Sequence, residues 1–261
     1  MDALSVVKSS YIIELIGKGE REDSRGMFDF RKLDIKTGLI EQAEGSAQVD
    51  LGNTRVLAGV KMVPEEPHSD TPKEGNIIVS AELLPLAAVE YETGPPSPEA
   101  IELSRVVDRG IRAANCVDLA SLFIEEGKVW SIYVDVYVLN YDGNLFDACT
   151  MAAMAALTDT HMPKYSDGAA DYKSRDADLP IKNIVTSTTF GKIGNSIVLD
   201  TTANEENAMD ARLTIQTDGE SIRAMQKGLK GSFSMGEIDK LIDISFDKHK
   251  EVMLHFKKHR K

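Results

Sequence analysis

The chain has 261 residues, 42% of them hydrophobic, and a formal net charge of −12. This length allows one large domain or two modest ones, and the apolar content is enough for a buried core, which excludes intrinsic disorder. An acidic chain is a poor general binder of nucleic acid, because phosphate binding depends on neutralisation by Lys and Arg. Any RNA contact must therefore come from a local basic patch or from a partner that completes the site.

The two cysteines, Cys116 and Cys149, stand in apolar surroundings without CxxC or Cys–His spacing. We expect core thiols in a reducing compartment, and neither a disulfide nor a zinc site. The first residues lack a basic segment followed by a long apolar run, and no stretch has the length and hydropathy of a membrane span. These features predict a soluble cytoplasmic protein with no membrane partner.

Apolar spacing in the first half predicts a helix over 4–16, two strands within 45–62 and a strand at 76–86. An amphipathic helix is expected from Pro98 to Asn115, after a proline-rich break. A long alternating strand at 129–140 then leads into residues 144–161, which are apolar nearly all round. Such a helix is typically sandwiched in the core.

Residues 163–180 are polar and mixed in charge, which predicts a long loop between two halves. Beyond it we expect four strands within 181–226 and a final helix from Met235. The order of elements predicts an α+β (mixed α/β) fold of two related β-sheet and helix half-domains around a buried central helix. The predicted divisions are an N-terminal helix at 1–20, a first half at 21–165, a loop at 166–180 and a second half at 181–261.

The helix from Pro98 carries three arginines, Arg105, Arg109 and Arg112, on the side opposite its apolar face. Guanidinium groups at this spacing suit a row of phosphates. The same spacing fits an ordinary solvated face, because Glu102 lies three residues before Arg105 and Asp108 four before Arg112. From the pattern alone the solvated face is the favoured interpretation.

The turn into the buried helix, residues 141–147, resembles an anion site in its position, since helix N-termini attract anions. However, its first turn offers Leu145, Phe146 and Asp147, with no Arg, Lys or Ser. A carboxylate suits the helix dipole and repels phosphate, so we interpret Asp147 as a cap.

Acidic residues gather in two segments, and either could hold Mg²⁺ through one or two carboxylates. Loops rich in Asp are more often simply solvated, and we favour that interpretation here, as we do for the basic end at 257–261. The five histidines show no metal-ligand spacing. The acidic residues are Asp167, Asp171, Asp176, Asp178, Asp200, Glu205, Glu206 and Asp210.

Several long blocks, at residues 75–87, 99–157, 198–215 and 224–239, resemble the RNase PH superfamily in the order that family has them. The similarity extends from about Gly19 to the final helix. It is strongest to the branch that forms the non-catalytic ring subunit of archaeal exosomes, beside a catalytic RNase PH-like sister.

The resemblance implies that two features of active members are missing. Active members bind phosphate with a Gly-Thr/Ser-Arg turn at the start of the buried helix, where this chain has Asn144-Leu145-Phe146. They also carry an aspartate in the pattern D-[LM]-N-V-V-M-T, where this chain has PIKNIVTS with Pro180 or Ile181 at the carboxylate position. Asp176 and Asp178 are close in sequence and leave an active 3′→5′ exoribonuclease as an alternative.

The arginine helix is retained, and the resemblance reverses the interpretation of it. Arg105 and Arg109, and more weakly Arg112, are implied to hold RNA near its 3′ end in a cleft shared with the sister. The implied assembly is three heterodimers in a six-membered ring with RNA-binding cap subunits, acting on single-stranded RNA. This chain would supply no catalytic residue, metal site or cofactor, because phosphate and Mg²⁺ would be used at the sister's site. A pure scaffold without RNA contacts is the second alternative.

Overall fold

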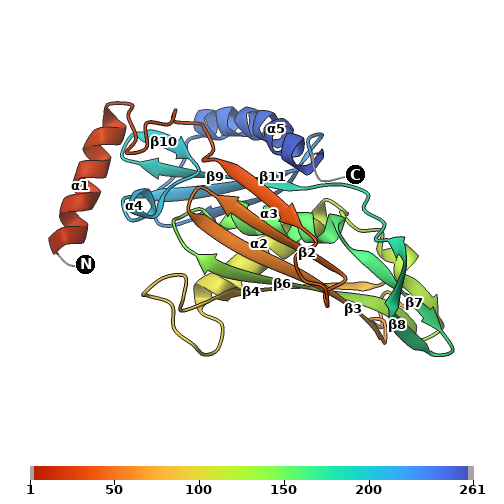
Figure 1. Ribbon diagram of the computed structural model, residues 1–261. Coiled ribbons are helices and arrows are strands. Elements are labelled where there is room, and N and C mark those ends of the chain that lie inside the picture. Colours follow the sequence, from red (N-terminus) through yellow and green to blue (C-terminus); the bar gives the residue numbers. More distant parts are fainter. Residues whose placement is uncertain (1–2, 258–261) are drawn as a thin grey trace.

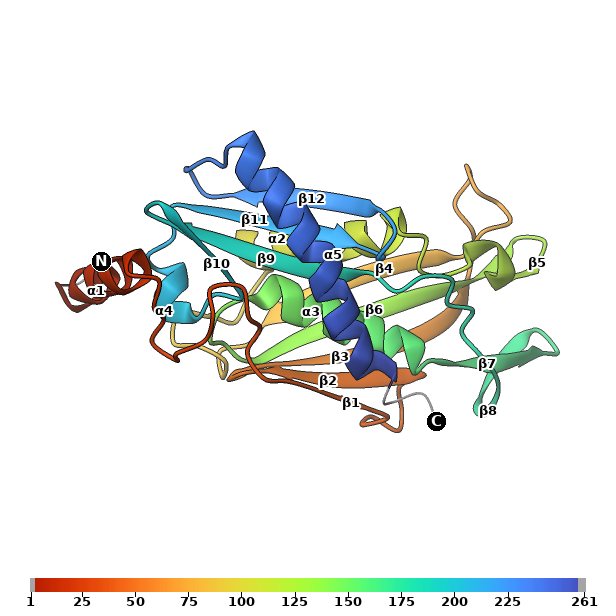
Figure 2. The ribbon, with the colours of Figure 1, turned by 90° about the horizontal axis from the view of Figure 1, so that it is seen from above.

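The computed structural model describes residues 3–257 and has four layers, with α3 (Leu145–Thr158) between two β-sheets (Figure 1). Helix α2 (Pro98–Ala113) lies beside α3 in the same layer, and α5 (Met235–Lys257) covers the outer face of the smaller sheet (Figure 2). The layers alternate sheet, helices, sheet, helix. This confirms the α+β architecture of two half-domains around a buried helix.

The larger sheet belongs to the first half and has the strand order β1-β2-β3-β6-β4, with β5 paired to β6. Its members are antiparallel except for β4, which runs parallel to β6 because α2 carries the chain back across the sheet. Strand β4 comes last in this order and is therefore an edge of the sheet. The strands are β1 (Leu33–Thr37), β2 (Gly45–Leu51), β3 (Thr54–Glu65), β4 (Asn76–Leu83), β5 (Phe123–Glu125) and β6 (Lys128–Asn140).

The smaller sheet belongs to the second half and has the order β10-β9-β11-β12, antiparallel throughout. Its inner face meets α3 and α2, while apolar side chains such as Phe190 and Leu241 join its outer face to α5. Strand β12 is an edge of this sheet. The elements are β9 (Thr186–Ile193), β10 (Ser196–Leu199), the short helix α4 (Ala203–Glu206), β11 (Ala211–Thr217) and β12 (Ile222–Gly228).

Helix α3 is buried on every side from Phe146 to Leu157. Alanine loses no side-chain conformational entropy when it is buried in a helix. Because the alanine side chains are small, both sheets can also pack closely against the helix. The sequence expectation of a sandwiched helix at 144–161 is therefore confirmed, with the helix ending at Thr158.

Helix α1 (Ala3–Gly17) projects from one end of the molecule (Figure 1). It is held by Ile12 and Ile16, which are buried against Ile193 and Val198 of the second half. The predicted helix at 4–16 is confirmed. Within the described residues, no helix combines the length and hydropathy needed to cross a membrane.

The predicted loop at 163–180 is wrong, because this segment forms a β-hairpin of β7 (His161–Ser166) and β8 (Ala169–Asp178). Its turn is Asp167-Gly168, where both residues have positive φ, as a tight hairpin turn requires. The strands are polar because most of the hairpin is exposed to solvent. An Asp-Gly pair is a strong hairpin signal, and the polarity of its flanks concealed it. The basic residues 258–261 lie outside the described part.

We predict that Ala152→Leu in α3 lowers the free energy of unfolding by about 1–3 kcal/mol or more, because the added methylenes have no space between two sheets. Ala113→Leu at the exposed end of α2 is the matched control and should change stability by less than about 0.5 kcal/mol. Urea unfolding followed by circular dichroism measures both. Equal stabilities of the two variants would contradict the packing described for α3.

Candidate functional site: an exposed arginine helix beside an acidic cavity

Helix α2 begins at a well-formed cap and presents its arginines to solvent. The Ser97 side chain accepts a hydrogen bond from the Ala100 backbone N–H, and Pro98 occupies the first turn. The apolar face, with Leu103 and Val107, is buried against the first sheet and α3. The opposite face is therefore held in a fixed orientation by the core.

The structure places Arg105, Arg109 and Arg112 together around a shallow hollow of about 430 Å³ on the exposed face of α2. Arg112 is compensated, because its Nε lies 2.9 Å from both carboxylate oxygens of Asp108 and its guanidinium also donates to the Ile77 carbonyl. Arg109 donates to the Gln226 side chain at 3.0 Å, which is a neutral partner.

Arg105 and Arg109 have no carboxylate within ion-pair distance among the described residues. Glu102, the partner expected for Arg105 on a solvated face, instead binds Arg212 of β11 at 2.6 Å. The expected pairing within the helix therefore forms for Arg112 and does not form for Arg105, while Arg105 and Arg109 are both exposed to solvent. Two uncompensated guanidinium groups one helical turn apart have the charge and geometry that suit neighbouring phosphates.

The turn that enters α3 is shaped by two residues with positive φ, Gly143 and Asn144. A Cβ at Gly143 would lie 2.3 Å from the Thr201 carbonyl oxygen, so only glycine fits. Asn144 tolerates the left-handed conformation better than most residues. Its side-chain amide is buried and donates to Asp147 at 2.8 Å and to Asp200 at 2.7 Å.

Asp147 does not cap α3 through the helix backbone, so the cap interpretation requires correction. The fully buried carboxylate accepts hydrogen bonds from Thr189 Oγ1 at 2.7 Å and Thr189 N at 2.9 Å, in addition to Asn144. It thus connects α3 to β9 of the second half. Burial raises the pKa of Asp147 to about 6. The hydrogen bonds from Thr189 and Asn144 lower this pKa, but their effect is smaller than that of burial.

The backbone N–H of Asn144, at the N-terminal end of α3, is already occupied by an internal anion. It donates to Glu206 Oε1 at 2.8 Å, and the Tyr141 hydroxyl donates to the other carboxylate oxygen at 2.6 Å. Burial raises the pKa of Glu206. A carboxylate of this same chain therefore occupies the N-cap donor of α3 and places negative charge where an incoming phosphate would approach.

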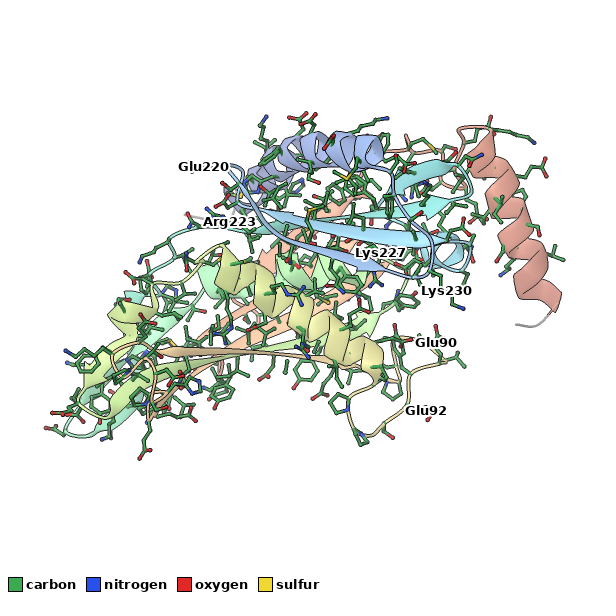
Figure 3. The ribbon with its side chains drawn as sticks, turned by 180° about the vertical axis from the view of Figure 1, so that it is seen from behind. Glu90, Glu92, Glu220, Arg223, Lys227 and Lys230 are labelled. Carbon is green, nitrogen blue, oxygen red and sulfur yellow. The ribbon has the colours of Figure 1, made fainter. Side chains whose placement is uncertain are left out.

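Beside this turn lies a cavity of about 290 Å³ whose lining is acidic. Its one cation is Arg212, whose guanidinium stacks 4.0 Å above the Phe146 ring and is neutralised by Glu102. The cavity lies beside the N-terminal half of α2, and Figure 3 labels Glu90 of its lining. Its charged lining residues are Glu90, Glu99, Glu102, Glu206 and Arg212.

This lining does not suit phosphate or a divalent cation. Phosphate would meet several carboxylates and one neutralised arginine. Within residues 3–257 no three His, Cys, Asp or Glu side chains converge as ligands for a metal ion. No reaction step through either group can be derived from these residues.

The carboxylates proposed for the alternative active enzyme lie elsewhere. Asp178 on β8 is exposed and pairs with His161 at 2.7 Å. Strand β8 and helix α4, which carries Glu206, lie at opposite ends of the molecule (Figure 1). Pro180 and Ile181 also lie away from the turn at Asn144, because Ile181 bridges to Val117 beyond the end of α2.

Sequence reasoning missed that the carboxylates beside the turn come from 200–206. It treated these residues as a solvated cluster, whereas Asp200, Glu205 and Glu206 are held in hydrogen bonds to residues far away in sequence. One signal was available: the capping box of Thr202 and Glu205 marks an ordered helix start.

Comparison with known proteins agrees with this arrangement. Domain 1 of the 3′ exoribonuclease (RNase PH) family matches residues 29–163, and domain 2 matches residues 183–248. The chain belongs to this family. Among solved structures of the family, the chain is similar to one described as the Archaeoglobus fulgidus exosome with RNA bound to the active site. The TM-score is 0.92 and the identity 43%, covering 98% of this chain and 100% of that one.

Close relatives in the family share one description. The exosome complex component Rrp42 of Thermococcus kodakarensis is 45% identical over 97% of this chain and 95% of its own length. That of Archaeoglobus fulgidus is 44% identical over 98% of each. A structure described as an archaeal exosome core matches with a TM-score of 0.87 at 40% identity, over 97% of this chain and 98% of that one.

The buried Asp147 carboxyl predicts a pH-dependent stability difference. Its pKa of about 6 in the folded state lies above its ordinary 3.8, so the protonated form stabilises the fold at low pH and this contribution is lost as pH rises through about 6. Relative to Asp147→Asn, the wild type should therefore gain about 2 kcal/mol between pH 6 and pH 4, out of about 3 kcal/mol for the full shift of about two pKa units. Urea titrations of both proteins across this range measure the difference, and Asp171→Asn on the exposed hairpin is the control. A constant difference from pH 4 to pH 7 would contradict the assignment.

Proposed function

We propose that the chain is a non-catalytic, ring-forming and RNA-positioning subunit of an archaeal-type exosome in the cytoplasm. It would pair with a catalytic RNase PH-like sister, form a six-membered ring of three such heterodimers, and work with RNA-binding cap subunits. Phosphate and Mg²⁺ would act at the sister's site during 3′→5′ phosphorolysis of single-stranded RNA. The names and titles of the similar proteins support membership in an exosome.

One observation carries the non-catalytic part of the proposal. Phosphorolysis needs a phosphate held in line with the scissile phosphodiester, and that depends on positive charge and free donors. Here the Asn144 N–H is bonded to Glu206, Phe146 lies where a cation is required, and Arg212 is bound to Glu102. These contacts leave the turn with a carboxylate where phosphate would bind and without an uncompensated cation, which supports the proposal.

The RNA-positioning part rests on Arg105 and Arg109. Their guanidinium groups face solvent without an ionic partner among the described residues, on a helix fixed by the core. An acidic protein can hold a polyanion in this way, because a local cationic strip acts at short range while salt screens the distant charge. Arg112 would contribute less, because Asp108 neutralises it.

We predict that the isolated chain does not shorten poly(A) in the presence of phosphate and Mg²⁺, and that the complex with the sister does. The release of nucleoside diphosphates, measured by chromatography, gives the rate. Asp178→Asn within the complex should leave kcat unchanged, because Asp178 lies on the distant hairpin. Phosphate-dependent turnover by the isolated chain would refute the non-catalytic assignment.

We further predict that Arg105→Glu with Arg109→Glu weakens RNA binding by the assembled complex and flattens its dependence on salt, because two phosphate contacts are lost. Lys164→Glu with Lys173→Glu on the exposed β7–β8 hairpin makes the same change in net charge and should leave binding nearly unchanged. Fluorescence anisotropy with a labelled 30-nucleotide poly(A) measures both. Unaltered binding in the arginine variant would support a pure scaffold.

A further inference from the structure

The free edge of β12 lies directly beside the arginine helix. Within the described residues β12 pairs only with β11, so its other side offers unpaired backbone groups. The hydrogen bond from Arg109 to Gln226 joins α2 to this strand at 3.0 Å. The edge and the helix therefore lie side by side, as Figure 3 shows in the view from behind.

Three cations follow β12 and the turn after it: Arg223, Lys227 and Lys230 (Figure 3). Arg223 is paired with Asp218 and so is largely neutralised. Lys227 and Lys230 are exposed and have no carboxylate within ion-pair distance among the described residues; the Lys227 ammonium donates only to the carbonyl of Leu229. What distinguishes these two from other unpaired lysines is their place beside the arginine helix, because Lys227 directly follows Gln226, the partner of Arg109.

We propose that Lys227 and Lys230 extend the strip of Arg105 and Arg109 across the free edge of β12, as a second set of contacts for the RNA backbone. This rests on the proposed function. Lysine ammonium groups act as mobile point charges toward phosphate, and free backbone N–H groups of the strand edge add donors without sequence preference. The chemistry recognised is a single-stranded polyanion.

Acidic residues lie at the same end of the molecule as Lys227 and Lys230 but on the opposite side of α2 (Figure 3), and they set the direction of this path across the helix. Glu90 and Glu92 are exposed in the loop before α2, near the acidic cavity, and on the side of α2 away from β12 (Figure 3). A strand of phosphates is repelled there and attracted at Lys227 and Lys230. RNA that rests on Arg105 and Arg109 is thereby turned toward the smaller sheet.

A structural role for these lysines makes a different prediction. Lysines on an edge strand hinder unwanted strand pairing, and an edge strand can also be covered by a neighbouring subunit. In those cases neutralising Lys227 and Lys230 alters aggregation or assembly and leaves the salt dependence of RNA binding unchanged.

The test compares Lys227→Gln with Lys230→Gln against the matched pair Lys164→Gln with Lys173→Gln, both in the complex with the sister. The probe is labelled 30-nucleotide poly(A), titrated by anisotropy at several salt concentrations, and mass photometry monitors the ring. We expect the slope of log K against log[salt] to fall in magnitude by about 1.4 in the β12 variant, from two contacts at about 0.7 each. The control pair should keep the wild-type slope, and both rings should assemble.

Each other outcome decides against the inference. An unchanged slope in the β12 variant overturns it, and a loss of ring assembly assigns this edge to subunit contacts instead. The arginine variant separates the two proposals. If Arg105→Glu with Arg109→Glu weakens binding and the β12 variant does not, the strip ends at α2 and the proposed function stands. If neither weakens binding, the RNA-positioning function itself fails.

Discussion

The two halves of this protein are joined around one buried carboxylate, Asp200. Its oxygens accept hydrogen bonds from Arg25 and Arg31 of the N-terminal segment and from the Asn144 amide at the start of α3, over 2.7–3.0 Å. Arg31 also donates to the Asp142 carbonyl, so the turn before α3 is held from both sides. A buried ion with two cations and an amide is costly to disrupt, because each partner would be left in a dry interior without compensation. These hydrogen bonds of Asp200 and Arg31 therefore fix the conformation of the turn before α3.

The contacts of Asp200 also limit which hydrogen-bond donors of the turn remain available to a ligand. The side-chain amide of Asn144 is bonded to Asp147 and Asp200 and its N–H to Glu206, so the donors of this residue are already used within the protein and three carboxylates surround them. The stacking of Arg212 on Phe146 completes the same pattern, since the one cation of the cavity is consumed by Glu102. In this chain the turn is a structural connection between the two halves, and the unpaired arginines Arg105 and Arg109 lie outside it on α2.

Much of the fold could be predicted from the sequence, because long periodic segments such as 98–115 and 144–161 bury one face or all faces. Resemblance then identified the family and directed attention to Arg105 and Arg109. The β7–β8 hairpin was missed because its strands bury little. The site carboxylates were missed because Glu206 reaches Asn144 across 62 residues, and no local pattern encodes such a contact. Likewise, Glu102 pairs with Arg212 of β11 and not with Arg105 of its own helix, and only the folded chain brings Arg212 close to Glu102.

The most direct measurement is a structure of the complex formed with the sister subunit, determined with inorganic phosphate and a short RNA bound. The account predicts phosphate in the sister's pocket alone, with Glu206 still bonded to the Asn144 N–H in this chain and the RNA backbone resting on Arg105 and Arg109. A phosphate coordinated at Asn144–Phe146 of this chain, with Glu206 displaced, would contradict it.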